Sequence, residues 1–111
     1  MRLDRNISGD GRGKYGLIKN RELAALARRK HGALPDDVVH ALNVLEDHAL
    51  LDWGTTPETE FFVMRLKDES AAGGLRGYAA AAWHLDEEYA REILRLADRA
   101  GPYHPNCKRP D

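Results

Sequence analysis

The residues best suited to binding chemistry lie near the start of the chain. Four cationic side chains and one aromatic ring occur close together there: Arg12, Lys14, Tyr15, Lys19 and Arg21. Glycines are interspersed among them, and closely spaced glycines expose backbone N–H groups that, together with Arg and Lys, suit a phosphate. The ring adds a flat surface that suits a nucleotide. We therefore predict a phosphate-bearing small ligand at these residues. The alternative is an irregular arm over residues 1–16 without a ligand.

A glycine pattern in the same stretch matches a nucleotide-binding motif only in part. The spacing Gly11-x-Gly13-x-x-Gly16 is that of dinucleotide-binding folds. In those folds the glycines follow a strand and open a helix within a βαβ unit. No clear strand precedes Gly11, and Lys14 is followed by Tyr15 rather than by the Ser or Thr of a phosphate-binding P-loop. The pattern therefore supports phosphate binding without a known nucleotide fold.

The chain offers little for catalysis or for a metal ion. His104 and Cys107 form the one close Cys/His pair, but they lie in a proline-containing tail that would hold catalytic geometry poorly. Their spacing is half of a zinc site, and the second half is missing. Asp36 and Asp37 are explained as residues of a helix start. We expect a non-enzymatic protein with no cofactor and no metal.

Charge is unevenly distributed along a chain whose formal net charge is −1. Residues 1–31 contain nine Lys/Arg and three Asp/Glu, whereas residues 35–60 contain seven Asp/Glu and no Lys or Arg. The basic first segment favours an anionic ligand or a self-complementary contact between copies. The acidic segment 36–60 offers a surface for a protein partner. DNA binding is disfavoured because it needs a continuous basic face.

Length and composition limit the class of protein. At 111 residues, the chain is predicted to form a single domain over 1–111, with an irregular N-terminal arm (1–16) and an extended C-terminal tail (102–111). A single cysteine excludes an internal disulfide, and no apolar run is long enough to span a membrane. The polar, glycine-rich start is unlike a signal peptide. We expect a cytoplasmic protein.

Capping residues and apolar periodicity predict four helices, at about 20–31, 35–49, 70–84 and 86–100. Leu50–Trp53 and Glu60–Leu66 have the composition of strands, and a turn at 54–59 would join them into a hairpin. Tyr15–Lys19 is a further candidate strand. The expected class is α+β, with about four helices, a central β-hairpin and a winged-helix-like order in the first half.

The third predicted helix carries an unusual set of small residues on one side: Gly73, Gly74, Gly77, Ala80 and Ala81. A glycine inside a helix costs about 1 kcal/mol relative to alanine, so three of them need a reason. Three reasons remain open: a neighbouring helix of this chain, the same helix in a second copy, or a ligand on the flat surface. We expect a homo-oligomer with Gly73, Gly74, Gly77 and Ala81 at the contact.

Four segments, Gly11–Ile18, Leu51–Gly54, Glu60–Asp68 and Ala100–Asp111, look like segments of small uncharacterised bacteriophage proteins. The similarity extends over most of the chain and brings no known activity and no functional residue. It implies action inside a bacterial host cell and a host-directed role, such as binding a defence protein or sequestering a nucleotide signal.

Three functions follow from these observations. The first is a non-enzymatic, phage-encoded and host-directed binding protein for a phosphate-bearing small molecule such as a nucleotide signal. The second is a protein-binding inhibitor of a host defence system that uses segment 36–60. The third is a winged-helix-like DNA-binding regulator, against which the four acidic residues of the second helix argue because DNA is itself anionic.

Overall fold

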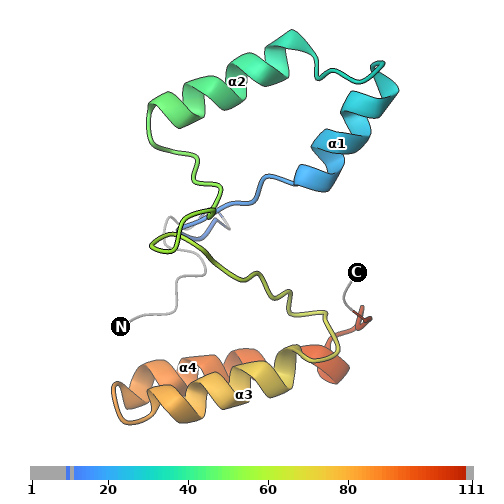
Figure 1. The fold of residues 1–111 in the computed structure, drawn as a ribbon. Coiled ribbons are helices and arrows are strands. Elements are labelled where there is room, and N and C mark those ends of the chain that lie inside the picture. The colour runs from blue at the N-terminus through green and yellow to red at the C-terminus, as the bar shows by residue number, and fades with distance from the viewer. Residues whose placement is uncertain (1–9, 11, 110–111) are drawn as a thin grey trace. The chain divides into compact units, whose positions relative to one another are not determined.

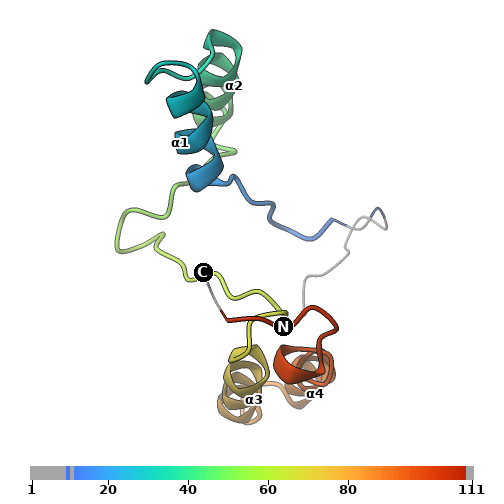
Figure 2. The ribbon, with the colours of Figure 1, turned by 90° about the vertical axis from the view of Figure 1, so that its right-hand side faces the viewer.

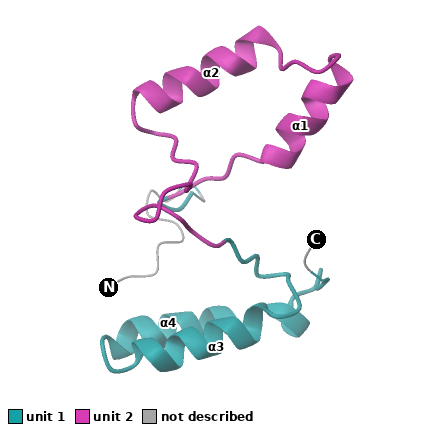
Figure 3. Ribbon diagram, in the orientation of Figure 1, with its two compact units in different colours: residues 1–14, 63–111 teal, residues 15–62 magenta. Residues whose placement is uncertain are grey.

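The computed structural model describes residues 10 and 12–109 and shows four α-helices in that part of the chain (Figure 1 and Figure 2). They are α1 (Asn20–Arg29), α2 (Asp36–Asp47), α3 (Ala71–Ala82) and α4 (Glu87–Ala97), and a 3₁₀ turn, η1 (Gly101–Tyr103), follows. The chain divides into two compact units (Figure 3). Unit 1 comprises residues 1–14 and 63–111 and holds α3, α4 and η1, whereas unit 2 comprises residues 15–62 and holds α1 and α2.

Local sequence explains where the helices begin and end. Asp86 caps α4, because its Oδ1 accepts the backbone N–H of Tyr89 at 3.0 Å. α2 begins after Pro35 and has Asp36 and Asp37 in its first turn, where the helix dipole favours negative charge. α1 is followed by His31 and Gly32, both in the left-handed region at φ values of 62° and 92°. The prediction of four helices is confirmed.

All buried residues of the described chain lie in unit 1, between α3 and α4 and just after α4. Most of them are alanines, so the two helices run side by side at short range (Figure 2). The full set is Ala71, Ala72, Ala79, Ala82, Ala90, Ile93, Leu96, Ala97, Ala100 and Gly101. Apolar spacing in the sequence predicts a core stripe for the third helix at Ala71, Leu75, Tyr78, Ala82 and Leu85. Tyr78 and Leu85 are instead exposed, at 55% and 77%.

The predicted hairpin over 50–66 is wrong, and the α+β class is wrong with it. Residues 10 and 12–109 contain no strand, so the described fold is all-helical. Leu50–Trp53 and Glu60–Leu66 are irregular, and Tyr15–Lys19 is not a strand either. Strand propensity reflects packing against a neighbouring strand and burial, and Phe61 and Phe62 have neither, being 62% and 88% exposed. The winged-helix-like order fails for the same reason, since the described chain has no wing.

The end of that segment pairs with the C-terminal tail instead. The Lys67 carbonyl accepts the N–H of Lys108 at 2.9 Å, and the Lys108 carbonyl accepts the N–H of Glu69 at 2.8 Å. This pairing forms an isolated parallel bridge between Asp68 and Lys108. The tail is therefore attached to the start of α3. The N-terminal arm lies mostly outside the described residues, Gly11 included, and residues 12–16 lack regular structure.

Gly101 fixes the exit from α4. Its φ of 58° lies in the left-handed region, and its N–H donates to the Leu66 carbonyl at 2.7 Å. A Cβ at this position would lie 3.0 Å from the Glu69 carbonyl oxygen and 3.2 Å from the Ala72 Cβ. Both the backbone conformation and the crowding therefore require glycine here.

We predict that Gly101→Ala lowers the free energy of unfolding of unit 1 by about 1–3 kcal/mol, because alanine is strained at positive φ and crowds α3. Gly77→Ala is the matched control. A Cβ at Gly77 meets nothing within 4 Å, so this change should raise stability by about 0.5–1 kcal/mol. Urea denaturation followed by circular dichroism measures both. Two changes of the same sign would contradict the account.

Candidate functional site

Four of the five predicted ligand residues lie on the stretch that leads into α1, Arg21 lies in its first turn, and all five are exposed. Arg12 and Lys14 belong to unit 1, whereas Tyr15, Lys19 and Arg21 belong to unit 2. Asp10 accepts the backbone N–H of Arg12 at 3.0 Å, and its other carboxylate oxygen lies 4.0 Å from Arg12 Nε. This carboxylate offsets the charge that Arg12 would offer to an anion. Phosphate binding at these residues stays a prediction.

The small face of α3 is open to solvent in this structure. Cβ atoms built on Gly73 and Gly77 would meet nothing within 4 Å, and Ala81 is exposed. Gly74 differs, because a Cβ there would lie 3.1 Å from the Met64 sulfur. α4 packs on the alanine side of α3, so the close approach of α4 does not account for Gly73 and Gly77. A contact between copies through this face stays a prediction.

His104 and Cys107 form a turn. The Cys107 N–H donates to the His104 carbonyl at 3.1 Å, and the Asn106 N–H donates to His104 Nδ1 at 3.0 Å. The imidazole therefore has a structural role in the tail. Across residues 10 and 12–109, no three His, Cys, Asp or Glu side chains are grouped as a metal ion would require.

Unit 2 has a feature that the sequence analysis missed: none of residues 15–62, all of which the structure describes, is buried. Each helix has an apolar stripe that is only half-buried, with Leu23, Leu26 and Ala27 on α1 and Val38, Leu42 and Leu45 on α2. In Figure 1, α1 and α2 separate as they leave the turn that joins them, whereas α3 and α4 stay side by side. The two amphipathic helices of unit 2 therefore lack the core that such faces normally contact.

The segment after α2 adds large apolar side chains to this surface. Leu50 is 75% exposed, and Phe61 and Phe62 are also exposed. The segment is nevertheless ordered by local contacts. The indole N–H of Trp53 donates to Glu46 Oε1 at 3.1 Å. Gly54 has a φ of 66°, and a Cβ there would overlap the Phe61 ring. These contacts tie the apolar loop to the C-terminal end of α2.

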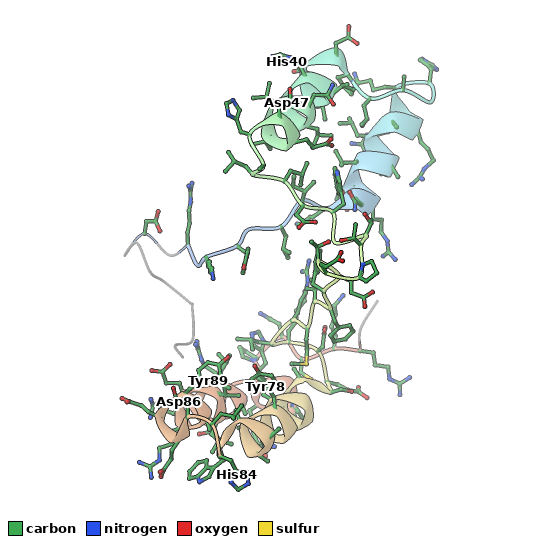
Figure 4. The ribbon with its side chains drawn as sticks, turned by 60° about the vertical axis from the view of Figure 1, so that its left-hand side comes forward. His40, Asp47, Tyr78, His84, Asp86 and Tyr89 are labelled. Atoms are coloured by element: carbon green, nitrogen blue, oxygen red, sulfur yellow. The ribbon has the colours of Figure 1, made fainter. Side chains whose placement is uncertain are left out.

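Charge on unit 2 is separated between its helices. α1 and its flanks carry Lys19, Arg21, Arg28, Arg29 and Lys30, with Glu22 as the one acid. α2 carries Asp36, Asp37, Glu46 and Asp47 and has no basic residue in its last turn. Asp47 and His40 are seven residues apart on α2, which places them on one face (Figure 4). The acids at the end of α2 face the negative end of its helix dipole, so this arrangement is unfavourable without a cationic partner.

Polar and aromatic contacts in unit 1 support its fold rather than a site. The rings of Tyr78 and Tyr89 meet edge to face with centroids 6.3 Å apart, and their hydroxyls are 3.5 Å apart (Figure 4). This hydrogen bond, and to a lesser extent burial, raises the pKa of Tyr89. The Arg91 guanidinium lies over the Trp83 ring at 5.6 Å from the ring centroid. These contacts join α3 to α4 at the end where Asp86 caps α4.

Comparison with known proteins does not extend this picture. No family model matches the chain, and no curated protein and no solved structure matches it either. No helix in the described part of the chain has the length and apolar character needed to cross a bilayer. The resemblance to phage proteins stays a prediction, and the function is argued from the residues themselves.

The phosphate hypothesis predicts that nucleotides bind at the cationic stretch with a dissociation constant below the millimolar range. Isothermal titration with a panel of mono-, di- and cyclic nucleotides measures this binding. Exchanging Lys19 and Arg21 for Ala should weaken it by removing charge-assisted donors. Absence of heat with every nucleotide at millimolar concentration would end the hypothesis.

We predict that unit 1 loses stability above about pH 10, the ordinary pKa of tyrosine. Because the folded pKa of Tyr89 is raised, its contribution is fully present below the unfolded pKa and is lost as the pH rises through the folded pKa. Tyr89→Phe should show a smaller loss, and Tyr103→Phe serves as the control. Urea denaturation at about pH 9 and about pH 11 gives the comparison. Equal losses in wild type and Tyr89→Phe would contradict the assignment.

Proposed function

We propose that the protein is a non-enzymatic protein-binding protein whose residues 15–62 complete their folding on a protein partner. The observation that carries this proposal is the lack of any buried residue in that range, although two amphipathic helices and several large apolar side chains lie within it. Surfaces of this kind mark sites of interaction in soluble proteins.

The energetics of short helices support a partner. α1 has 10 residues and α2 has 12. Isolated helices below about 12–15 residues are marginal in water, and most helical stability in proteins comes from packing an apolar face. Fully burying a Leu or Phe side chain contributes about 1.5–3 kcal/mol. Burying Leu50, Phe61 and Phe62 against a partner would therefore add to the free energy that offsets the entropy lost on ordering the unit.

The charge of unit 2 indicates what kind of surface its partner would present. The exposed face of α2 and the loop after it are acidic, and residues 35–60 contain no Lys or Arg. A partner that fits this surface presents an apolar face bordered by Lys or Arg. Nucleic acid does not fit, because its phosphates would repel the carboxylates of α2. The acidic segment 36–60 is thus the binding segment, as the second of the three predicted functions has it.

We predict that the amides of α1 and α2 exchange with solvent much faster than those of α3 and α4 in a dilute solution of the protein. The reason is that opening α1 or α2 exposes little apolar surface, whereas opening α3 or α4 exposes the alanine core. Hydrogen exchange measured by mass spectrometry on the whole chain reports both units at once, so α3 and α4 act as the internal control.

Strong protection of α1 and α2 in the dilute monomer would overturn the proposal, because a unit that is already stable needs no partner. Replacing Asp36, Asp37 and Asp47 with Lys should abolish the protection that a partner gives to 15–62. A matched variant in unit 1, Asp98→Lys, should leave it unchanged, because Asp98 is an exposed residue at the end of α4.

A further inference from the structure

We infer that the partner of residues 15–62 is a second copy of the chain, with α1 of each copy packed antiparallel on α2 of the other. This inference rests on the proposed function and identifies the partner that the function requires. The partner must present an apolar stripe bordered by cations, and α1 is such a helix: Leu23, Leu26 and Ala27 form the stripe, and Lys19, Arg21, Arg28, Arg29 and Lys30 are the cations.

Charges at the helix ends specify the direction of this pairing. Lys19 and Arg21 lie at the N-terminal end of α1, and Glu46 and Asp47 lie at the C-terminal end of α2, each pair at the helix end where the dipole disfavours its charge. Antiparallel pairing places these two ends together. It also brings Arg28 and Arg29 toward the acidic first turn of α2. Both ends of the contact then join opposite charges.

The lengths and the symmetry are consistent with this contact. α1 and α2 are roughly 15 Å and 18 Å long at 1.5 Å per residue, so their stripes match over most of their length. A two-fold axis uses each surface twice, α1 on α2 and α2 on α1, and builds a four-helix arrangement. Leu50, Phe61 and Phe62, in the segment that follows α2, would extend the apolar contact.

The turn between the helices argues against closure of α1 on α2 within one copy. The N–H of Gly32 donates to the Ala27 carbonyl at 2.8 Å, and both His31 and Gly32 have positive φ. This hydrogen bond ends α1, and α1 and α2 diverge after the turn in Figure 1. The stripes of α1 and α2 are only half-buried within one copy, so each can also contact the other copy.

Two charge-reversed variants of the full chain test the inference. The first carries Lys19→Glu and Arg21→Glu, so both of its helices have an acidic end. The second carries Glu46→Lys and Asp47→Lys, so both have a basic end. Each variant alone should dimerise at least about tenfold more weakly than wild type, because like charges meet at both contacts. An equimolar mixture should recover the dimer, since opposite charges then meet at both contacts.

Sedimentation velocity over a range of protein concentrations measures the dissociation constants. The matched control is Arg95→Glu with Arg99→Glu. It makes the same change of charge as the first variant, at exposed positions of α4 and just after it, and should dimerise like wild type. Recovery in the mixture also shows that both variants fold. Wild type should dimerise more weakly as salt is raised, because the contact is electrostatic.

The results separate the inference from the proposed function. If wild type is monomeric at every concentration and α1 and α2 exchange rapidly, the inference is overturned and the proposed function stands with another partner. If α1 and α2 are protected in the monomer, both are overturned. If wild type dimerises but the two variants dimerise equally well on their own, the pairing of α1 with α2 is overturned. Dimerisation that is lost in each variant and regained in the mixture supports the inference.

Discussion

The packing of α3 on α4 through alanine side chains is the contact on which the described fold depends. Ala79 and Ala82 of α3 meet Ala90 and Ile93 of α4, and the small side chains allow the two helices to approach closely. A core of alanines buries little apolar area per residue, so other contacts matter more than usual. The Asp86 cap, the Tyr78–Tyr89 pair and the left-handed Gly101 are those contacts. The Asp86 cap and the Tyr78–Tyr89 pair act at one end of the helix pair, and Gly101 acts at the other.

Unit 2 is built on the opposite principle. Its helices have good apolar stripes, but nothing in residues 15–62 is buried. The sequences of α1 and α2 therefore favour helices locally, but residues 15–62 provide no buried core for these helices to pack against. Natural sequences tend to satisfy both levels, and a unit that satisfies only one is a candidate for completion by another chain. Because the cations lie on α1 and the acids on α2, the inferred pairing of α1 with α2 of another copy is antiparallel.

Local signals in the sequence were sufficient for the helices and insufficient for the strands. Pro35, Asp86 and the apolar spacing act within a few residues, so the four helices could be predicted. Glu60–Leu66 has strand composition, but a strand forms only with a partner, and the one bridge of the described residues joins Asp68, just after this segment, to Lys108, 40 positions away. No local sequence pattern predicts that pairing. Periodicity also placed Tyr78 in the core, where Ala79 is buried instead; successive positions on α3 differ by about 100° about the helix axis, so a modest error in placing the buried face exchanges the two residues.

Only the charge of the candidate site could be predicted from the sequence. The acidic segment 36–60 and the basic residues of α1 are visible in the sequence, but their stripes look the same whether they pack inside the chain or against another one. The exposure of Phe62 and Leu50 favours the second case. Gly73 and Gly77 of α3 touch nothing that would exclude a side chain, whereas Gly74 lies against Met64.

The attachment of the C-terminal tail has a practical consequence for spectroscopy. Cys107 is the one thiol in the sequence and is exposed, and the backbone of its neighbour Lys108 is hydrogen-bonded to Lys67 and Glu69. A paramagnetic probe coupled to this thiol would therefore report from a defined position beside the start of α3, with no engineered cysteine. Electron spin resonance of the labelled natural chain could then follow the motion of the tail itself.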